Sequence, residues 1–179
     1  GSGREAWPAG YFQRAGKEEQ AVSPAKRGNP RESLLISVQD LAAALSPGSA
    51  GPATGSAPWV VVDCRFNLLK PDAGRAAYLG GHIPGAWYAD LDRDLSARRG
   101  PGTGRHPLPD PNQVRALFSR FGITTGTRVV AYDEAGGGLS ARLWWLLRWM
   151  GHEPVVLLDG GLAAWQNAGL SLSQANPVP

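Results

Sequence analysis

The segment after the apolar run 128–132 combines glycines and carboxylates in a way that could bind a ligand. It reads DEAGGGLSA, and the dinucleotide spacing GxGxxG/A is met by Gly136, Gly138 and Ala141. Asp159 stands 21 residues after the second of these glycines, where dinucleotide-binding folds use an acidic residue to bind ribose. Asp133 and Glu134 would repel a pyrophosphate, however. Dinucleotide binding is therefore an alternative, and glycines that simply permit a sharp turn are the favoured interpretation.

Cys64 is the one cysteine of the chain and so the one thiol nucleophile to consider. It follows Asp63 at the end of an apolar run and precedes Arg65, a cation that could lower the pKa of a thiol. No glycine turn or helix start follows it, and position 70 is lysine where cysteine phosphatases need arginine. Because free cysteines are usually buried, we interpret Cys64 as a structural residue.

Histidines and clustered carboxylates do not predict a metal site. His82, in the stretch GGHIPGAWY, is expected to hydrogen-bond the loop backbone. His106 and His152 have no partner at metal-ligand spacing and are expected at the surface. The start of a calcium loop is imitated by Asp90, Asp92 and Asp94, but Leu95 and Pro101 replace the glycine and glutamate that such a loop needs. We therefore predict neither a metal nor another cofactor.

Composition and charge describe one ordinary domain. The chain has 179 residues, 42% of them hydrophobic, which suffices to bury a core without disulfides. Its net charge is +3 and no basic stripe with interleaved aromatic residues occurs, so we expect no nucleic-acid partner. No apolar run approaches the about 20 residues of a membrane span, and no signal peptide is recognisable at the start. We therefore expect no membrane partner and a cytoplasmic location.

Alternating patterns divide the chain into elements. Residues 1–32 lack apolar periodicity and are expected to form a flexible leader, followed by a domain over 33–172 and a linker over 173–179. Strands are predicted at 34–37, 59–63, 86–89, 128–132 and 154–159. Helices are predicted at 38–45, 73–79, 111–122, 139–151 and 161–169. Strands that alternate with helices in this way are typical of an α/β sandwich with a mainly parallel sheet.

The carboxyl ends of the strands are where such folds carry out their chemistry. In this chain those ends lie at Asp63, Asp133 and Asp159. The helix 139–151 is apolar nearly all round, so a sheet can cover only one of its faces. If a second domain is missing, we therefore expect one or more of its tryptophans to be exposed; the alternative is that residues 34–58 cover the helix completely.

Four motifs in order resemble the rhodanese family of sulfurtransferases. They are VVVDCRF, YLGGHIPGAWYADL, the unit from YDEAGGGLS to ARLWWLLRWMGH, and VVLLDGGLAAW. The resemblance covers about residues 34–172 and is to the non-catalytic N-terminal half of tandem thiosulfate and 3-mercaptopyruvate sulfurtransferases. It implies a three-layer sandwich around a central, mainly parallel five-stranded sheet. It also implies a structural motif made of Asp63, Arg65, His82, Arg142, Asp159, Gly160, Gly161 and Trp165.

The chain differs from this family at the position of the nucleophile. Active domains of this family begin the turn after the fourth strand with a persulfide-forming cysteine, and Asp133 stands at that position. A carboxylate cannot pass on sulfane sulfur, so we expect no catalytic residue in this chain. The degenerate active loop would consist of Asp133, Glu134, Ala135, Gly136, Gly137, Gly138, Leu139 and Ser140. The resemblance implies a silent domain partnered by a catalytic rhodanese domain of the same parent protein; a free-standing inactive module for protein binding or regulation is the alternative.

Overall fold

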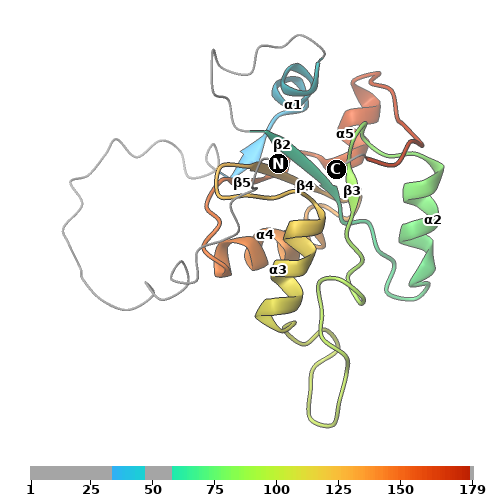
Figure 1. Ribbon diagram of the computed structural model, residues 1–179. Helices are drawn as coiled ribbons and strands as arrows, with labels where there is room; N and C mark the ends of the chain where they lie inside the picture. The colour runs from blue at the N-terminus through green and yellow to red at the C-terminus, as the bar shows by residue number, and fades with distance from the viewer. Residues whose placement is uncertain (1–33, 47–57, 178–179) are drawn as a thin grey trace.

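The computed structural model describes residues 34–46 and 58–177, so the expected leader lies outside the described residues. Its centre is a five-stranded sheet in the order β1-β5-β4-β2-β3, and every strand pair is parallel (Figure 1). The strands are β1 (Leu35–Ile36), β2 (Trp59–Asp63), β3 (Trp87–Tyr88), β4 (Arg128–Tyr132) and β5 (Val155–Leu158). The predicted α/β sandwich around a mainly parallel sheet is thereby confirmed. β1 and β3 are shorter than predicted because each lies at an edge and has one neighbour.

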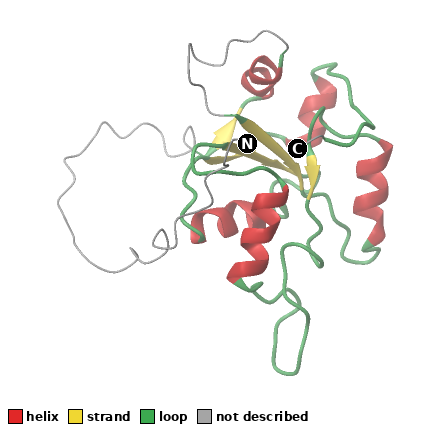
Figure 2. Cartoon of the chain, in the orientation of Figure 1, coloured by secondary structure: helices red, strands yellow, loops and turns green. Residues whose placement is uncertain are grey.

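Helices cover both faces of the sheet (Figures 1 and 2). They are α1 (Val38–Leu45), α2 (Asp72–Gly80), α3 (Pro111–Arg120), α4 (Ser140–Trp149) and α5 (Gly161–Asn167). α3 and α4 bury their apolar residues against one face, and α1 and α5 against the other. α2 stands beside the β3 edge (Figure 1). None of the helices in these two described ranges is long and apolar enough to cross a membrane.

Side-chain caps set the starts of α1 and α3. The hydroxyl of Ser37 accepts a hydrogen bond from the Asp40 amide at 3.1 Å, and the Asp110 carboxylate accepts one from the Asn112 amide at 2.8 Å. Each cap satisfies an amide that lacks a partner in the first helical turn. α3 turns one apolar face inward, and the buried side chains of that face and of the residue after the helix are Val114, Leu117, Phe118 and Phe121.

The apolar helix α4 is covered on one side only. Leu143, Leu146 and Leu147 are fully buried, whereas Trp145 and Trp149 are 41% and 42% exposed. The two exposed indoles stack on each other with their ring centroids 5.6 Å apart. Stacking reduces the apolar area that each ring presents to water. No described residue covers the remaining exposed area of the two indoles.

One predicted position is wrong. His152 was expected at the surface, yet it is only 1% exposed. Gly151 adopts a left-handed conformation after α4, and the His152 amide donates to the Leu147 carbonyl at 2.9 Å. This turn carries the imidazole inward instead of outward. Burial lowers the pKa of His152, so its ring is neutral at pH 7.

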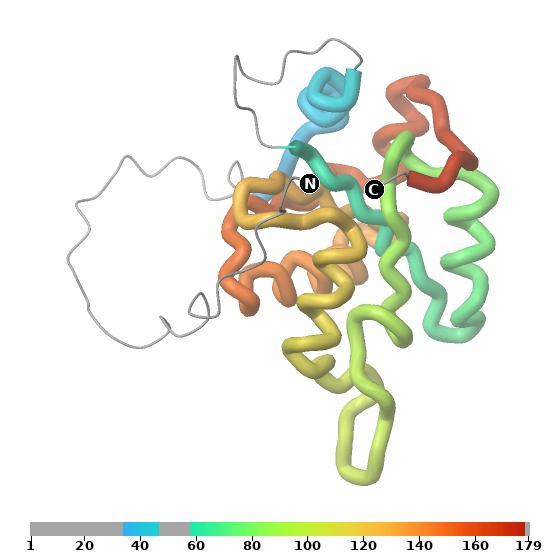
Figure 3. The backbone as a smooth tube through the Cα atoms, in the orientation of Figure 1, coloured from blue at the N-terminus to red at the C-terminus, as the bar shows by residue number. Residues whose placement is uncertain are grey.

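A long loop between β3 and α3 extends from the body of the domain (Figure 3). Its first turn is closed by Asp90, whose carboxylate accepts the amides of Asp92 and Arg93 at 2.9 and 3.0 Å. Arg142 on α4 holds the loop further along, donating to the carbonyls of Leu95 and Pro107 at 3.1 and 3.0 Å. The guanidinium of Arg142 therefore positions a loop.

We predict that Gly74→Ala destabilises the domain by about 2 kcal/mol, because added core volume forces neighbours apart. A Cβ atom at Gly74 would overlap the Arg65 carbonyl oxygen and lie 2.8 Å from the Tyr88 hydroxyl. Gly80→Ala at the end of the same helix is the control, since a Cβ there meets nothing within 4 Å. Urea unfolding measures both free energies. Equal values for the two variants would contradict a close approach of α2 to Arg65.

Candidate functional site

The turn after β4 is built around the carboxylate of Asp133. Four backbone amides donate to it: those of Ala135 and Gly137 at 2.8 and 2.9 Å, and those of Leu139 and Ser140 at 2.9 and 2.7 Å. The side chain itself is buried, with Asp133 1% exposed. The carboxylate thus occupies the centre of a ring of donors at the start of α4, where the helix dipole also favours negative charge.

Two glycines give this turn its shape. Gly136 and Gly137 have φ values of 72° and 90°, in the left-handed region that side chains disfavour. Gly161 of the neighbouring turn has a φ of 58°, and a Cβ there would overlap the Asp133 carbonyl oxygen. That carbonyl accepts the Leu162 amide at 3.0 Å. The turns after β4 and β5 are therefore in direct contact. In the sequence they belong to two separate features, the degenerate active loop and the motif VVLLDGGLAAW.

The amides around Asp133 determine its charge state. Burial alone would raise the pKa of this carboxyl, but the hydrogen bonds from the Ser140, Gly137 and Ala135 amides outweigh it and lower the pKa. Asp133 is therefore ionised at neutral pH. Each oxygen of the Asp133 carboxylate accepts two of the four hydrogen bonds, and the group contains no sulfur. In this turn it therefore acts as a fixed anion and not as a nucleophile.

A buried ion pair stands at the end of β2. The Arg65 guanidinium donates to the Asp63 carboxylate at 2.7 Å and to the Gly81 carbonyl at 2.7 Å. Tyr132 donates its hydroxyl to the same carboxylate at 2.7 Å and accepts the Ile83 amide at 3.2 Å. Burial followed by the charge of Asp63 raises the pKa of Tyr132, so the phenol stays protonated. The sequence motif contained Asp63 and Arg65, whereas Tyr132 was missed.

The electrostatics also make Cys64 inert. It is 2% exposed, and its pKa is raised well above the ordinary value, first by burial and then by the charges of Asp63 and Asp133. A thiol that stays protonated is a poor nucleophile. The neighbouring Arg65 guanidinium is paired with Asp63 and bonded to the Gly81 carbonyl. The sequence-based interpretation of Cys64 as structural agrees with this geometry.

The other motif residues serve the backbone. His82 lies between two carbonyls, with Nδ1 2.8 Å from the Tyr78 oxygen and Nε2 3.0 Å from the Ala175 oxygen, as a loop-binding histidine should. Trp165 is buried and donates its indole N–H to the Ser171 carbonyl at 3.1 Å. These contacts hold the segment after α5 against the domain.

The motif after β5 forms the turn into α5. Asp159 is exposed, and its amide donates to the Ile36 carbonyl at 2.9 Å. Gly160 has a φ of 70°, which lets the chain enter α5 directly after the strand. No group of three or more His, Cys, Asp or Glu side chains within residues 34–46 and 58–177 could hold a metal ion.

We predict that Asp133→Asn lowers the free energy of unfolding at pH 7 by about 1–3 kcal/mol, because an amide nitrogen would face the donors of the turn. The folded pKa of Asp133 lies below its ordinary value of 3.8, so its contribution is present above that value and is lost as pH falls through the lowered pKa. The difference from wild type should therefore shrink in acid. Denaturant titrations between pH 7 and pH 2 measure it, with exposed Glu134→Gln as the control. A difference that does not depend on pH would contradict this assignment.

Comparisons with known proteins identify relatives over most of the domain. A probable 3-mercaptopyruvate sulfurtransferase of Pseudomonas aeruginosa is 48% identical over 142 residues, covering 78% of this chain and 46% of the relative. The human 3-mercaptopyruvate sulfurtransferase is 38% identical over 152 residues, covering 81% and 48%. The structure of the 3-mercaptopyruvate sulfurtransferase SseA from Escherichia coli matches with a TM-score of 0.67 and 30% identity, covering 81% and 52%. The chain spans about half the length of the curated relatives it matches.

A family model described as the rhodanese-like domain matches residues 48–168. This range includes four of the five strands, from β2 to β5, and both the Asp63 and the Asp133 turns. Because the match covers more than half of the chain and the all-parallel sheet agrees with it, this chain belongs to the rhodanese-like domain family.

Proposed function

We propose that this chain is a catalytically silent rhodanese-like domain of a sulfurtransferase, and that it works beside a catalytic rhodanese domain of the same parent protein. The observation that carries the proposal is the carboxylate of Asp133 inside its ring of four amides. In active domains of the family a cysteine begins this turn and carries sulfur as a persulfide. Here the donors that would stabilise a sulfur anion are already satisfied by a permanent side-chain anion.

The parent reaction would transfer sulfane sulfur from thiosulfate or 3-mercaptopyruvate to a thiol or cyanide. A thiolate of the other domain would attack the outer sulfur of thiosulfate, form a persulfide and release sulfite. Cys64 is unsuited to this step because it is buried and its thiol stays protonated. The named sulfurtransferases among the relatives, and the half-length match to them, support this parent reaction.

Two alternatives differ in class. A free-standing inactive module for protein binding or regulation would have the same turn but no catalytic domain in its parent protein. Dinucleotide binding is disfavoured by the geometry, since a pyrophosphate would need the amides that Asp133 already occupies. The coding sequence downstream of residue 179 separates the first alternative from the proposal, because only the proposal requires a second rhodanese domain with a loop cysteine.

We predict that the purified chain produces thiocyanate from thiosulfate and cyanide, or sulfide from 3-mercaptopyruvate, no faster than a boiled sample. Cys64→Ser should leave that background unchanged. A cyanide-dependent rate well above background that Cys64→Ser abolishes would refute catalytic silence.

The matched experiment uses the parent protein. Serine in place of the loop cysteine of its second domain should abolish turnover, whereas Cys64→Ser should retain it. A parent protein with no such cysteine would refute the tandem arrangement and favour the free-standing module.

A further inference from the structure

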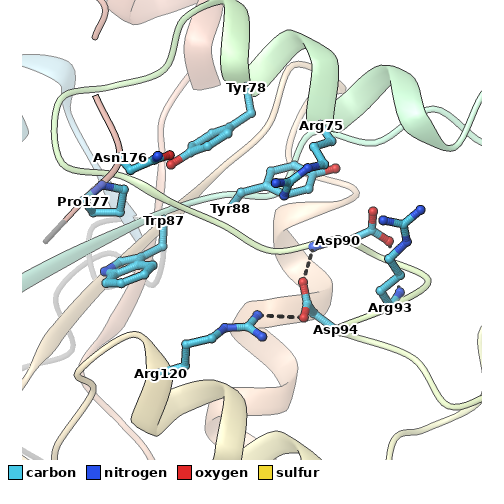
Figure 4. A pocket seen from close by; sticks show the side chains of 10 residues that line it. All are labelled: Arg75, Tyr78, Trp87, Tyr88, Asp90, Arg93, Asp94, Arg120, Asn176 and Pro177. Carbon is cyan, nitrogen blue, oxygen red and sulfur yellow. Dashed lines mark hydrogen bonds and ion pairs between the residues drawn. The ribbon is translucent and has the colours of Figure 1, made fainter. Parts of the chain in front are cut away.

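A groove of about 350 Å³ lies beside β3, and no residue of the Asp133 turn lines it (Figure 4). It is lined by Arg75, Tyr78, Trp87, Tyr88, Asp90, Arg93, Asp94, Arg120, Asn176 and Pro177. β3 is the last strand of the sheet, so no further strand covers this side. The walls come from four separate segments: α2, the turn after β3, the end of α3, and the segment that follows α5.

Three arginines extend from three of these segments into the groove (Figure 4). Arg120 is paired with Asp94 at 2.7 Å. Arg93 is paired with Asp72 at 3.1 Å, but both side chains are largely exposed, so the pair contributes little. Arg75 makes no hydrogen bond or ion pair to any residue within 34–46 and 58–177. The guanidinium of Arg75 is therefore available to a ligand, and that of Arg93 is only weakly held.

The two carboxylates of the groove are already engaged. Asp90 accepts the amides of Asp92 and Arg93, and Asp94 accepts the Asp90 amide at 2.9 Å besides its ion pair with Arg120. Neither carboxylate is paired with Arg75. The lining has three arginines and two aspartates, and Asp72 beside it is paired with Arg93. Arg75 is therefore the cation of the groove that remains for an anionic group.

The floor of the groove is aromatic. Tyr78 and Tyr88 direct their hydroxyls to backbone carbonyls, of Ala86 at 2.8 Å and of Arg65 at 3.1 Å, so their rings contribute mainly apolar surface. One face of Trp87 stacks on Phe121, with ring centroids 5.4 Å apart. Pro177 lies near Trp87 across the groove (Figure 4). These side chains offer apolar surface to a flat ring.

The wall that holds Asn176 and Pro177 is fixed in place. The backbones of His82 and Ser173 exchange two hydrogen bonds of 2.9 and 2.8 Å, and the His82 imidazole lies 3.0 Å from the Ala175 carbonyl. His82 is itself fully buried and stacks on Tyr78, with ring centroids 4.0 Å apart. The same tyrosine thus contacts the groove and supports its far wall, so the groove is preformed.

The geometry points to a binding site for a small planar organic anion, of the aromatic carboxylate class. Its carboxylate would contact Arg75, and its ring would lie against Trp87. The volume is at the lower end of the range for small-molecule sites, which suits a small ligand. This assignment does not depend on the proposed function, because the groove shares no residue with the Asp133 turn.

The test titrates the full chain with benzoate and follows the Trp87 indole N–H and the backbone amides by NMR. Saturable shifts confined to the groove are expected, with a dissociation constant of about 1 mM, as suits a ligand of this size. Arg75→Gln should weaken binding by about fivefold through loss of the charge-assisted contact. Arg99→Gln, which removes an exposed charge outside the groove, should leave it unchanged.

Two further probes separate charge from shape. Acetate, an anion without a ring, should bind more weakly than benzoate. Benzylamine, a ring with the opposite charge, should not bind. The assignment is overturned if benzoate gives no saturable shift, if Arg75→Gln and Arg99→Gln change its affinity equally, or if benzylamine binds as well as benzoate.

Discussion

Backbone amides between β4 and α4 impose the constraint on which the candidate site depends. The turn after β4 and the start of α4 present several N–H groups, and each needs an acceptor. Asp133 is the acceptor for four of them. Its carboxylate stabilises the tight turn, and the same anion takes the place of a thiol nucleophile. The Asp133 carboxylate therefore accounts both for the shape of the turn and for its lack of a thiol.

The rest of the carboxyl edge is organised around a second anion. Asp63 is paired with Arg65 and receives the Tyr132 hydroxyl, and Tyr132 is the residue directly before Asp133. Through the Ile83 amide and the Gly81 carbonyl this network reaches the loop that carries His82. Buried charges are tolerated here because each has a partner with good geometry. Within the described residues, both carboxylates at this edge therefore have hydrogen-bond partners.

In the described part of this domain, the side chains that can still contact a ligand lie along a lateral edge of the sheet. They do not lie at the carboxyl ends of the strands. At the carboxyl ends, Asp63 and Asp133 have their hydrogen-bonding capacity filled. Along β3, by contrast, Arg75 makes no hydrogen bond or ion pair within the described ranges, above a floor of aromatic rings. The exposed Trp145 and Trp149 form another open surface, on α4.

Short-range interactions made much of the fold predictable from sequence. The valine-rich run of β4 must be buried, Ser37 and Asp110 cap the residues that follow them, and a carboxylate at Asp133 cannot do the chemistry of a thiol. Tertiary structure alone decided what long-range packing brings together: Tyr132 with Asp63, Gly161 with the Asp133 carbonyl, and His82 with Ala175. His152 was misplaced for a local reason, because the left-handed Gly151 turns the chain after α4 and carries the imidazole inward. The groove beside β3 could not be predicted from the sequence, because its walls come from segments that no local pattern connects.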